Sequence, residues 1–133
     1  MPIEYTIDRE RRLVLARGHG VVTHDDVHGY QRTVWSQPEV SGFDEIVDMT
    51  DVLRIAVPST DSVRELASLS AGMDAPYSSS RFAIVAPQDV AFGLGRMYQT
   101  YRGLDERSTK KVSVFRTRAE AMAFLDLEDQ PKG

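Results

Sequence analysis

Cysteine is absent from the 133-residue sequence. Its absence excludes disulfide bonds, thiolate metal sites and a cysteine nucleophile, and it is compatible with a cytoplasmic location. The sequence also lacks an apolar run of the roughly 18 residues that a membrane-spanning helix needs. No apolar stretch follows a basic start at the N-terminus, so no signal peptide is expected. We therefore expect a soluble, cytoplasmic protein without a membrane span.

A basic excess is missing as well. The 16 Lys and Arg residues are outnumbered by 20 Asp and Glu residues, which gives a net charge of −4. Proteins dedicated to nucleic-acid binding usually carry a concentrated basic surface, so we expect no nucleic-acid partner. The densest basic stretch, residues 107–111, precedes a predicted strand, and we expect it to be an exposed loop.

The remaining composition is that of a globular domain. Charged residues make up 27% of the chain and hydrophobic residues 41%, which are ordinary values for a folded protein. The length is that of a single domain. We expect this domain over residues 1–127, followed by a disordered tail over residues 128–133.

Alternation of strands and helices is the most informative pattern. Residues 3–7 alternate apolar and polar side chains, which predicts an edge strand paired in a hairpin with a second strand over residues 13–22. From there, a β-prone run is followed by a polar-capped helix four times. We expect the later strands at residues 43–49, 81–86 and 112–115, and helix starts near residues 23, 59, 87 and 117. This alternation predicts an α/β fold with a largely parallel sheet.

His24 and His28 are one helical turn apart, as are two zinc ligands of many metalloproteases. Asp25 would have to replace the catalytic glutamate, and no third ligand is evident. Because both histidines fall near the start of a capped helix, we expect a solvent-exposed helix start and no bound metal. We expect no cofactor either.

Several large side chains are candidates for lining an apolar ligand groove. Trp35, the only tryptophan, continues a stripe that runs from the two histidines through Gln31. Packing at the helix margin is the favoured interpretation of Trp35. The candidate lining residues are Trp35, Met73, Met97, Tyr98 and Tyr101.

Gly93 and Gly95 form a Gly-x-Gly pair after a predicted strand. A phosphate-binding loop places its glycines between the strand and the helix. Residues 87–89 already occupy that position here, so we expect close helix packing in preference to nucleotide binding.

Ser59, Thr60 and Asp61 form the polar start of the predicted second helix. Their favoured role is capping, with Asp61 complementing the positive helix end. A hydroxyl group there is also suited to phosphorylation, because new charge at a helix end alters docking. No Ser–His–Asp or paired-carboxylate arrangement can be assembled from the sequence, so we expect no enzyme activity.

Four segments, residues 42–52, 81–87, 92–98 and 111–117, resemble the STAS superfamily of bacterial anti-sigma-factor antagonists, especially its SpoIIAA-like branch. With their flanking elements they cover nearly the whole chain. The resemblance implies a mixed five-stranded sheet, with strand one antiparallel, and about four helices. The antagonists carry an Asp-Ser-Ser-Gly-like segment after strand three, in which a kinase phosphorylates one serine. Residues 56–59 read Ala-Val-Pro-Ser at this place, so only Ser59 and Thr60 could substitute.

Three functions follow from these observations. The favoured one is a non-enzymatic, STAS-like regulatory or interaction domain, whose protein partner contacts Ser59, Thr60 and Asp61. The second is a module that binds a small apolar or anionic, lipid-like ligand. The third and least favoured is a metal-dependent hydrolase that uses His24 and His28. A homodimer is compatible with each of them.

Overall fold

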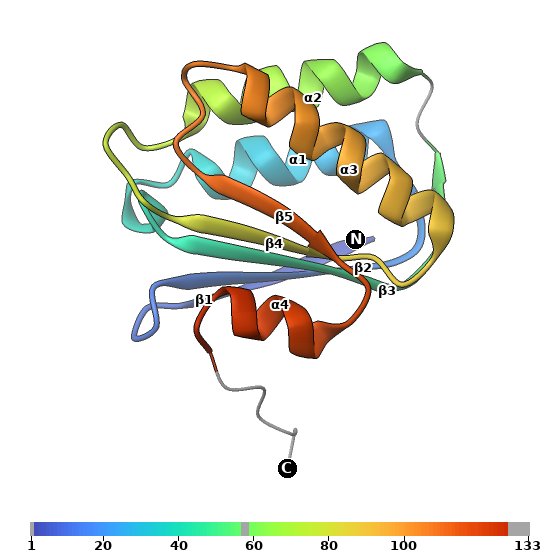
Figure 1. Ribbon diagram of the computed structural model, residues 1–133, viewed down its shortest axis with the longest axis horizontal. Helices are drawn as coiled ribbons and strands as arrows, with labels where there is room; N and C mark the ends of the chain where they lie inside the picture. Colours follow the sequence, from blue (N-terminus) through green and yellow to red (C-terminus); the bar gives the residue numbers. More distant parts are fainter. Residues whose placement is uncertain (1, 57–58, 128–133) are drawn as a thin grey trace.

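The computed structural model describes residues 2–56 and 59–127, and the predicted tail lies outside them. Within the described residues the chain forms a five-stranded sheet, four α-helices and a short 3-10 helix (Figure 1). The strands are β1 (Ile3–Asp8), β2 (Leu13–Thr23), β3 (Asp44–Ala56), β4 (Arg81–Val85) and β5 (Lys111–Phe115). The helices are α1 (His24–Trp35), η1 (Pro38–Val40), α2 (Thr60–Met73), α3 (Asp89–Leu104) and α4 (Arg118–Phe124). None of the described helices combines the length and apolar content required to cross a bilayer.

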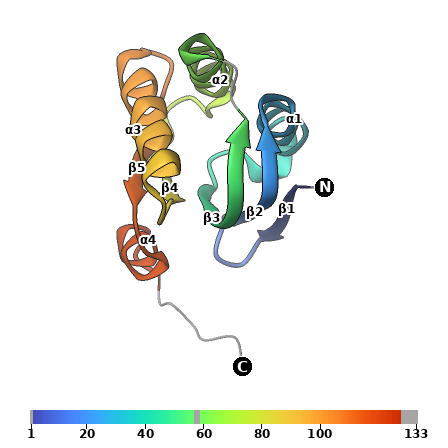
Figure 2. The same cartoon turned by 90° about the vertical axis from the view of Figure 1, so that its right-hand side faces the viewer.

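The sheet has the strand order β1-β2-β3-β4-β5. Strand β1 pairs antiparallel with β2, and the other neighbours are parallel. Helices α1, α2 and α3 cover one face of the sheet, and α4 lies on the opposite face (Figures 1 and 2). This confirms the predicted α/β architecture, including the antiparallel first strand. Each parallel connection moves one strand further along the sheet, which places the three crossover helices side by side on one face.

Strand β3 is longer than predicted. We expected it over residues 43–49, but it runs from Asp44 to Ala56. Its pairing with β4 ends at Asp48, whereas its pairing with β2 continues to Ala56. The second half of β3 therefore belongs to a two-stranded extension of the sheet. Thr50, Asp51 and Arg54 interrupt its apolar residues and are exposed, so this half lacks the unbroken apolar run of a covered strand.

Strand β4 is covered on both faces, as its unbroken apolar run predicted. Phe82 and Ile84 belong to the core beneath α2 and α3. Ala83 and Val85 belong to the core beneath α4. A parallel strand that helices cover on both sides has no solvent-exposed face, which explains why its sequence does not alternate apolar and polar residues.

Side-chain caps form at the starts of α1, α2 and α4 as predicted, whereas Gln88 before α3 makes no side-chain capping bond. The Thr23 hydroxyl accepts a hydrogen bond from the Asp26 backbone N–H at 3.2 Å, and the Asp26 carboxylate accepts one from the Thr23 N–H at 2.8 Å. At α4 the Thr117 hydroxyl accepts from the Glu120 N–H at 3.2 Å. These bonds satisfy N–H groups that have no partner within the helix.

Helix α3 packs closely on β5 through Gly95. A Cβ atom at this position would lie 3.1 Å from a methyl group of Val114, so the helix reaches the sheet only because glycine stands there. This confirms packing as the role of Gly95. Helical spacing of the apolar residues in this segment predicts Val90 on the inner face, but it is 71% exposed. The inner face runs instead through Ala91, Gly95, Tyr98 and Arg102, one residue out of phase with Val90.

Candidate ligand-binding site

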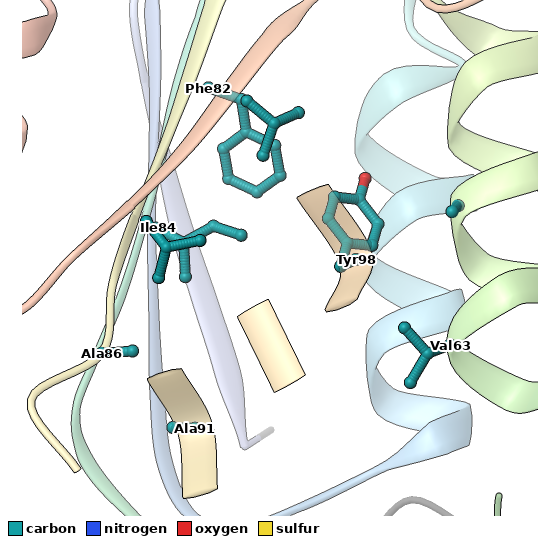
Figure 3. Packing of buried hydrophobic residues seen from close by; sticks show 9 residues of the cluster. Val63, Phe82, Ile84, Ala86, Ala91 and Tyr98 are labelled. Carbon is teal, nitrogen blue, oxygen red and sulfur yellow. The ribbon is translucent and has the colours of Figure 1, made fainter. Parts of the chain in front are cut away.

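An apolar cavity of about 130 Å³ lies between helices α1, α2 and α3 and the sheet. Figure 3 shows part of its wall, with Phe82 and Ile84 projecting from β4 toward the side where Tyr98 and Val63 lie. The apolar lining comes from β2, β3 and β4 (Val22, Val47, Met49, Ile55, Phe82, Ile84) and from the three helices (Val27, Val63, Leu66, Ala91, Leu94).

Three small residues, Gly18, Ala91 and Gly95, line the cavity. A Cβ atom on Gly18 would lie 2.8 Å from a Val52 methyl group, so close packing of the sheet edge keeps this position free of a side chain. Dry, apolar cavities of about 150 Å³ bind molecules of the size of benzene. The cavity is therefore suited to a ligand the size of a single ring.

One end of the cavity wall is polar. Glu45 of β3 is buried and accepts hydrogen bonds from Tyr30 Oη at 2.7 Å and Trp35 Nε1 at 3.1 Å. The Lys110 ammonium group donates to the other oxygen of Glu45 at 3.2 Å and lies 3.2 Å from the centroid of the Trp35 ring. Burial lowers the pKa of Lys110, and the negative charge of Glu45 acts in the opposite direction. The Glu45 charge is thus compensated inside the protein.

A second buried ion pair supports Tyr98 at the same end. Arg102 donates to the Tyr98 hydroxyl oxygen at 2.5 Å and to Asp74 Oδ2 at 2.5 Å. Asp74 also accepts the backbone N–H groups of Thr109 and Lys110, at 2.9 and 3.1 Å. Burial raises the pKa of Tyr98 to about 12, so its phenol keeps its proton at neutral pH. This pair ties the ends of α2 and α3 to the segment before β5.

Gln31 and Ser70 complete the polar end. The Ser70 hydroxyl donates to Gln31 Oε1 at 3.0 Å, which links α1 to α2. Gln31 Nε2 lies 3.7 Å from the sulfur atom of Met73. The polar groups around the cavity therefore hold one another in place.

The structure separates the five candidate groove residues. Tyr98 lines the apolar cavity. Trp35 and Met73 line a second, smaller pocket of about 30 Å³ beside Asp74 and Lys110. Met97 and Tyr101 pack against the core beneath α2 and α3 and line neither of these two spaces.

Sequence reasoning missed the polar residues of the site. Glu45 stands beside Ile46 and Val47 in a buried strand, a position at which an acid needs a partner. The partner, Lys110, was expected in an exposed loop, but its side chain is only 6% exposed. The loop folds inward because Asp74 binds its backbone and Glu45 binds its ammonium group.

The expectation that both histidines are exposed is wrong for His28. Its residue exposure is only 7%, and its ring centroid lies 4.0 Å from that of His24. Helix α2 packs against α1 and buries this position, so the inner face of α1 includes His28 and Gln31 as well as Val34. Burial lowers the pKa of His28, and the nearby His24 and Arg32 lower it further. Among the described residues no group of three or more His, Asp or Glu side chains is arranged to hold a metal ion.

Comparison with solved structures identifies a similar fold. No protein-family model matches the chain, and no curated protein matches it. A solved structure of an uncharacterised DUF3478-family protein from Shewanella loihica PV-4, described as having a SpoIIAA-like fold, matches with a TM-score of 0.57. The similarity covers 92% of this chain and 93% of the other, at 15% sequence identity. The chain has a SpoIIAA-like fold. This confirms the fold that the sequence resemblance implied.

The SpoIIAA-like fold places Ser59, Thr60 and Asp61 at the start of α2, after β3. All three residues are exposed. The Ser59 hydroxyl accepts a hydrogen bond from the Ser62 backbone N–H at 3.3 Å, which confirms the predicted cap. Asp61 and Arg64 form an exposed ion pair at 3.4 Å. Of the segment before Ser59, Ala56 ends β3, and residues 57–58 lie outside the described residues.

Proposed function

We propose that this protein is a non-enzymatic regulatory domain that binds a small apolar ligand in the cavity beneath α1, α2 and α3. The observation that carries the proposal is the cavity itself, which is about 130 Å³ in volume and lined almost wholly by apolar side chains. Ligand sites are commonly concave and apolar with a few polar groups, and this cavity, which is partly open to solvent, has that character. The buried ion pairs at one end hold the surrounding helices in position without a bound ligand.

Benzene binding tests this proposal. Benzene should raise the melting temperature of the protein, because a ligand that binds only the folded state stabilises it. Ala91→Leu places a larger side chain at the cavity wall and should abolish this effect. Val90→Leu is the matched control, because Val90 is the neighbouring residue of α3 and is exposed. The proposal fails if benzene near its solubility limit changes neither the melting temperature nor the NMR spectrum of the wild-type protein.

A second candidate function is binding of a protein partner at the start of α2. It is supported by the SpoIIAA-like fold and by the exposure of Ser59, Thr60 and Asp61. In STAS antagonists, which the sequence resembles, the regulatory serine follows strand three. The fold alone does not specify function, so this candidate rests on the surface and its test.

The test is a comparison of captured proteins. Wild-type protein and the Ser59→Ala, Thr60→Ala double variant are used to isolate partners from the native host. Ser79→Ala, an exposed serine between α2 and β4, is the control. A specific partner should bind the wild-type and control proteins and be lost in the double variant. Retention of the same partner by the folded double variant would show that these hydroxyl groups serve only as caps.

A further inference from the structure

The polar side chains at one end of the cavity form a closed chain of hydrogen bonds. Arg102 Nη1 donates to the Tyr98 hydroxyl oxygen at 2.5 Å, and in Figure 3 this hydroxyl points away from Ala91, toward one end of the core. The Tyr98 hydroxyl lies within hydrogen-bonding distance of Ser70, whose oxygen can accept its proton. The Ser70 hydroxyl in turn donates to Gln31 Oε1 at 3.0 Å. Both hydroxyl groups of the chain therefore find their donor and their acceptor within the protein.

The other polar groups at this end are occupied as well. The Glu45 carboxylate accepts from Tyr30, Trp35 and Lys110. Among the described residues, the buried side-chain nitrogen or oxygen atom that lacks a hydrogen-bond partner is His28 Nε2, and His28 does not line the cavity. In the described part of the chain, the cavity wall thus presents no free side-chain donor or acceptor to a ligand.

A polar ligand group would be unpaired against this wall. A hydroxyl group that enters an apolar cavity loses its hydrogen bonds to water, which is costly unless the protein replaces them. A charged group costs more still, and the two buried cations are already paired, Lys110 with Glu45 and Arg102 with Asp74. A hydrocarbon loses no hydrogen bonds and gains from burial of its surface. Of the apolar and anionic ligands considered from sequence, the apolar class fits this wall.

Ser70 is the link that keeps the chain closed. Ser70, Tyr98 and Gln31 all line the cavity. Loss of the Ser70 hydroxyl would leave the Tyr98 proton and Gln31 Oε1 without their partner, at the surface that a ligand touches. The presence of this one hydroxyl group therefore decides whether the wall has a hydrogen bond to offer.

We propose that the cavity selects hydrocarbons the size of one ring over polar molecules of the same size, and that Ser70 determines this selectivity by closing the hydrogen-bond chain between Tyr98 and Gln31. The proposal rests on the ligand-binding function proposed above. It adds the chemistry that the ligand must have and the residue that sets it.

The test compares benzene with phenol, which has the same ring and one hydroxyl group. Affinities are measured by NMR titration at neutral pH, where phenol keeps its proton. The wild-type protein should bind phenol about ten- to a hundredfold more weakly than benzene, because the phenol hydroxyl is buried without a partner. In Ser70→Ala this preference should shrink about two- to tenfold, the value of one hydrogen bond, because Tyr98 and Gln31 become free to bond phenol.

Ser68→Ala is the matched control. Ser68 lies on the same helix, is exposed, and does not line the cavity; its hydroxyl accepts from Arg107 at 3.1 Å. Its substitution should leave the preference for benzene unchanged. If Ser70→Ala does not fold, Tyr98→Phe opens the chain on its other side and leaves the Ser70 oxygen free to accept from phenol, so the preference should shrink in this variant too.

The outcomes separate the two proposals. If neither probe binds the wild-type protein, the ligand-binding function fails and this inference fails with it. If benzene binds but phenol binds at least as tightly, only this inference is overturned, because the wall then has a hydrogen bond to offer. An unchanged preference for benzene in the folded Ser70→Ala or Tyr98→Phe variant, or an equal shrinkage in Ser68→Ala, would also overturn it, because Ser70 would then not set the selectivity.

Discussion

Lys110→Met should destabilise the protein strongly, although lysine at a surface loop is normally dispensable. The substitution keeps an unbranched side chain of similar length and removes the ammonium group. In the wild-type protein this group donates to Glu45 at 3.2 Å, and the two side chains are only 6% and 3% exposed. The substitution therefore leaves a buried carboxylate without its counter-charge.

The expected loss of unfolding free energy is about 3 kcal/mol. Removing one partner of a buried ion pair costs about 3–5 kcal/mol, because the remaining charge is uncompensated. Glu45 still accepts hydrogen bonds from Tyr30 and Trp35, at 2.7 and 3.1 Å, which places the cost at the lower end of this range. Against a total stability of about 5–15 kcal/mol this is a large fraction, but the protein should still fold.

Urea unfolding at neutral pH measures the effect. Lys111→Met is the matched control, because Lys111 is the exposed neighbour at the start of β5, and it should change stability by less than about 0.5 kcal/mol. Adding Glu45→Gln to Lys110→Met removes the buried charge and should restore most of the lost stability. A loss of less than about 1 kcal/mol at neutral pH, with no recovery in the double variant, would refute the burial of this pair.

Three further outcomes are expected. Burial lowers the pKa of His28, so the unfolded chain binds a proton at this histidine more readily than the folded protein does, and wild-type stability should fall as the pH drops below about 6.5. In urea unfolding, His28→Leu should weaken this pH dependence. The same dependence of unfolding free energy on pH in both proteins would contradict the prediction. Ser59→Ala should cost about 1 kcal/mol in thermal unfolding, because it removes the cap that bonds the Ser62 N–H; an unchanged melting temperature would show that the cap contributes nothing. Ile84→Asp should abolish folding, because an unpaired carboxylate at a 6% exposed position costs several kcal/mol; a cooperative transition at the wild-type temperature would rule this out.

Local signals in the sequence were sufficient for most of the fold. The apolar run of β4 and the caps at Thr23, Ser59 and Thr117 each depend on interactions close in the chain, and each was predicted. The second half of β3 was not, because it is held by pairing with β2 and carries mostly exposed residues. When the faces of a strand are largely open to solvent, its sequence does not alternate regularly between apolar and polar residues. Its pairing with a strand distant in the sequence therefore cannot be predicted from periodicity.

The site was harder to predict because its partners are far apart in the chain. Glu45 and Lys110 are 65 residues apart, and Gln31 and Ser70 are 39 apart. Each looks like a surface residue until its partner is known. Of the five groove residues proposed from sequence, only Tyr98, on the inner face of α3, lines the apolar cavity.

Helix α2 connects the two candidate functions. Its first turn follows the exposed Ser59 cap. Val63, Leu66 and Ser70, spread along its length, line the cavity, and Asp74 at its end forms the ion pair with Arg102. A helix is a stiff element, so a change in its position at the cavity is carried along its length to its first turn. Asp74 anchors the end of α2 through Arg102, and at its start the Ser59 hydroxyl contacts both the backbone N–H and the hydroxyl group of Ser62, while Val63 packs in the core. Because Val63 lies one turn after Ser59 and lines the cavity, a ligand that contacts Val63 would act close to the surface at which a protein partner would bind.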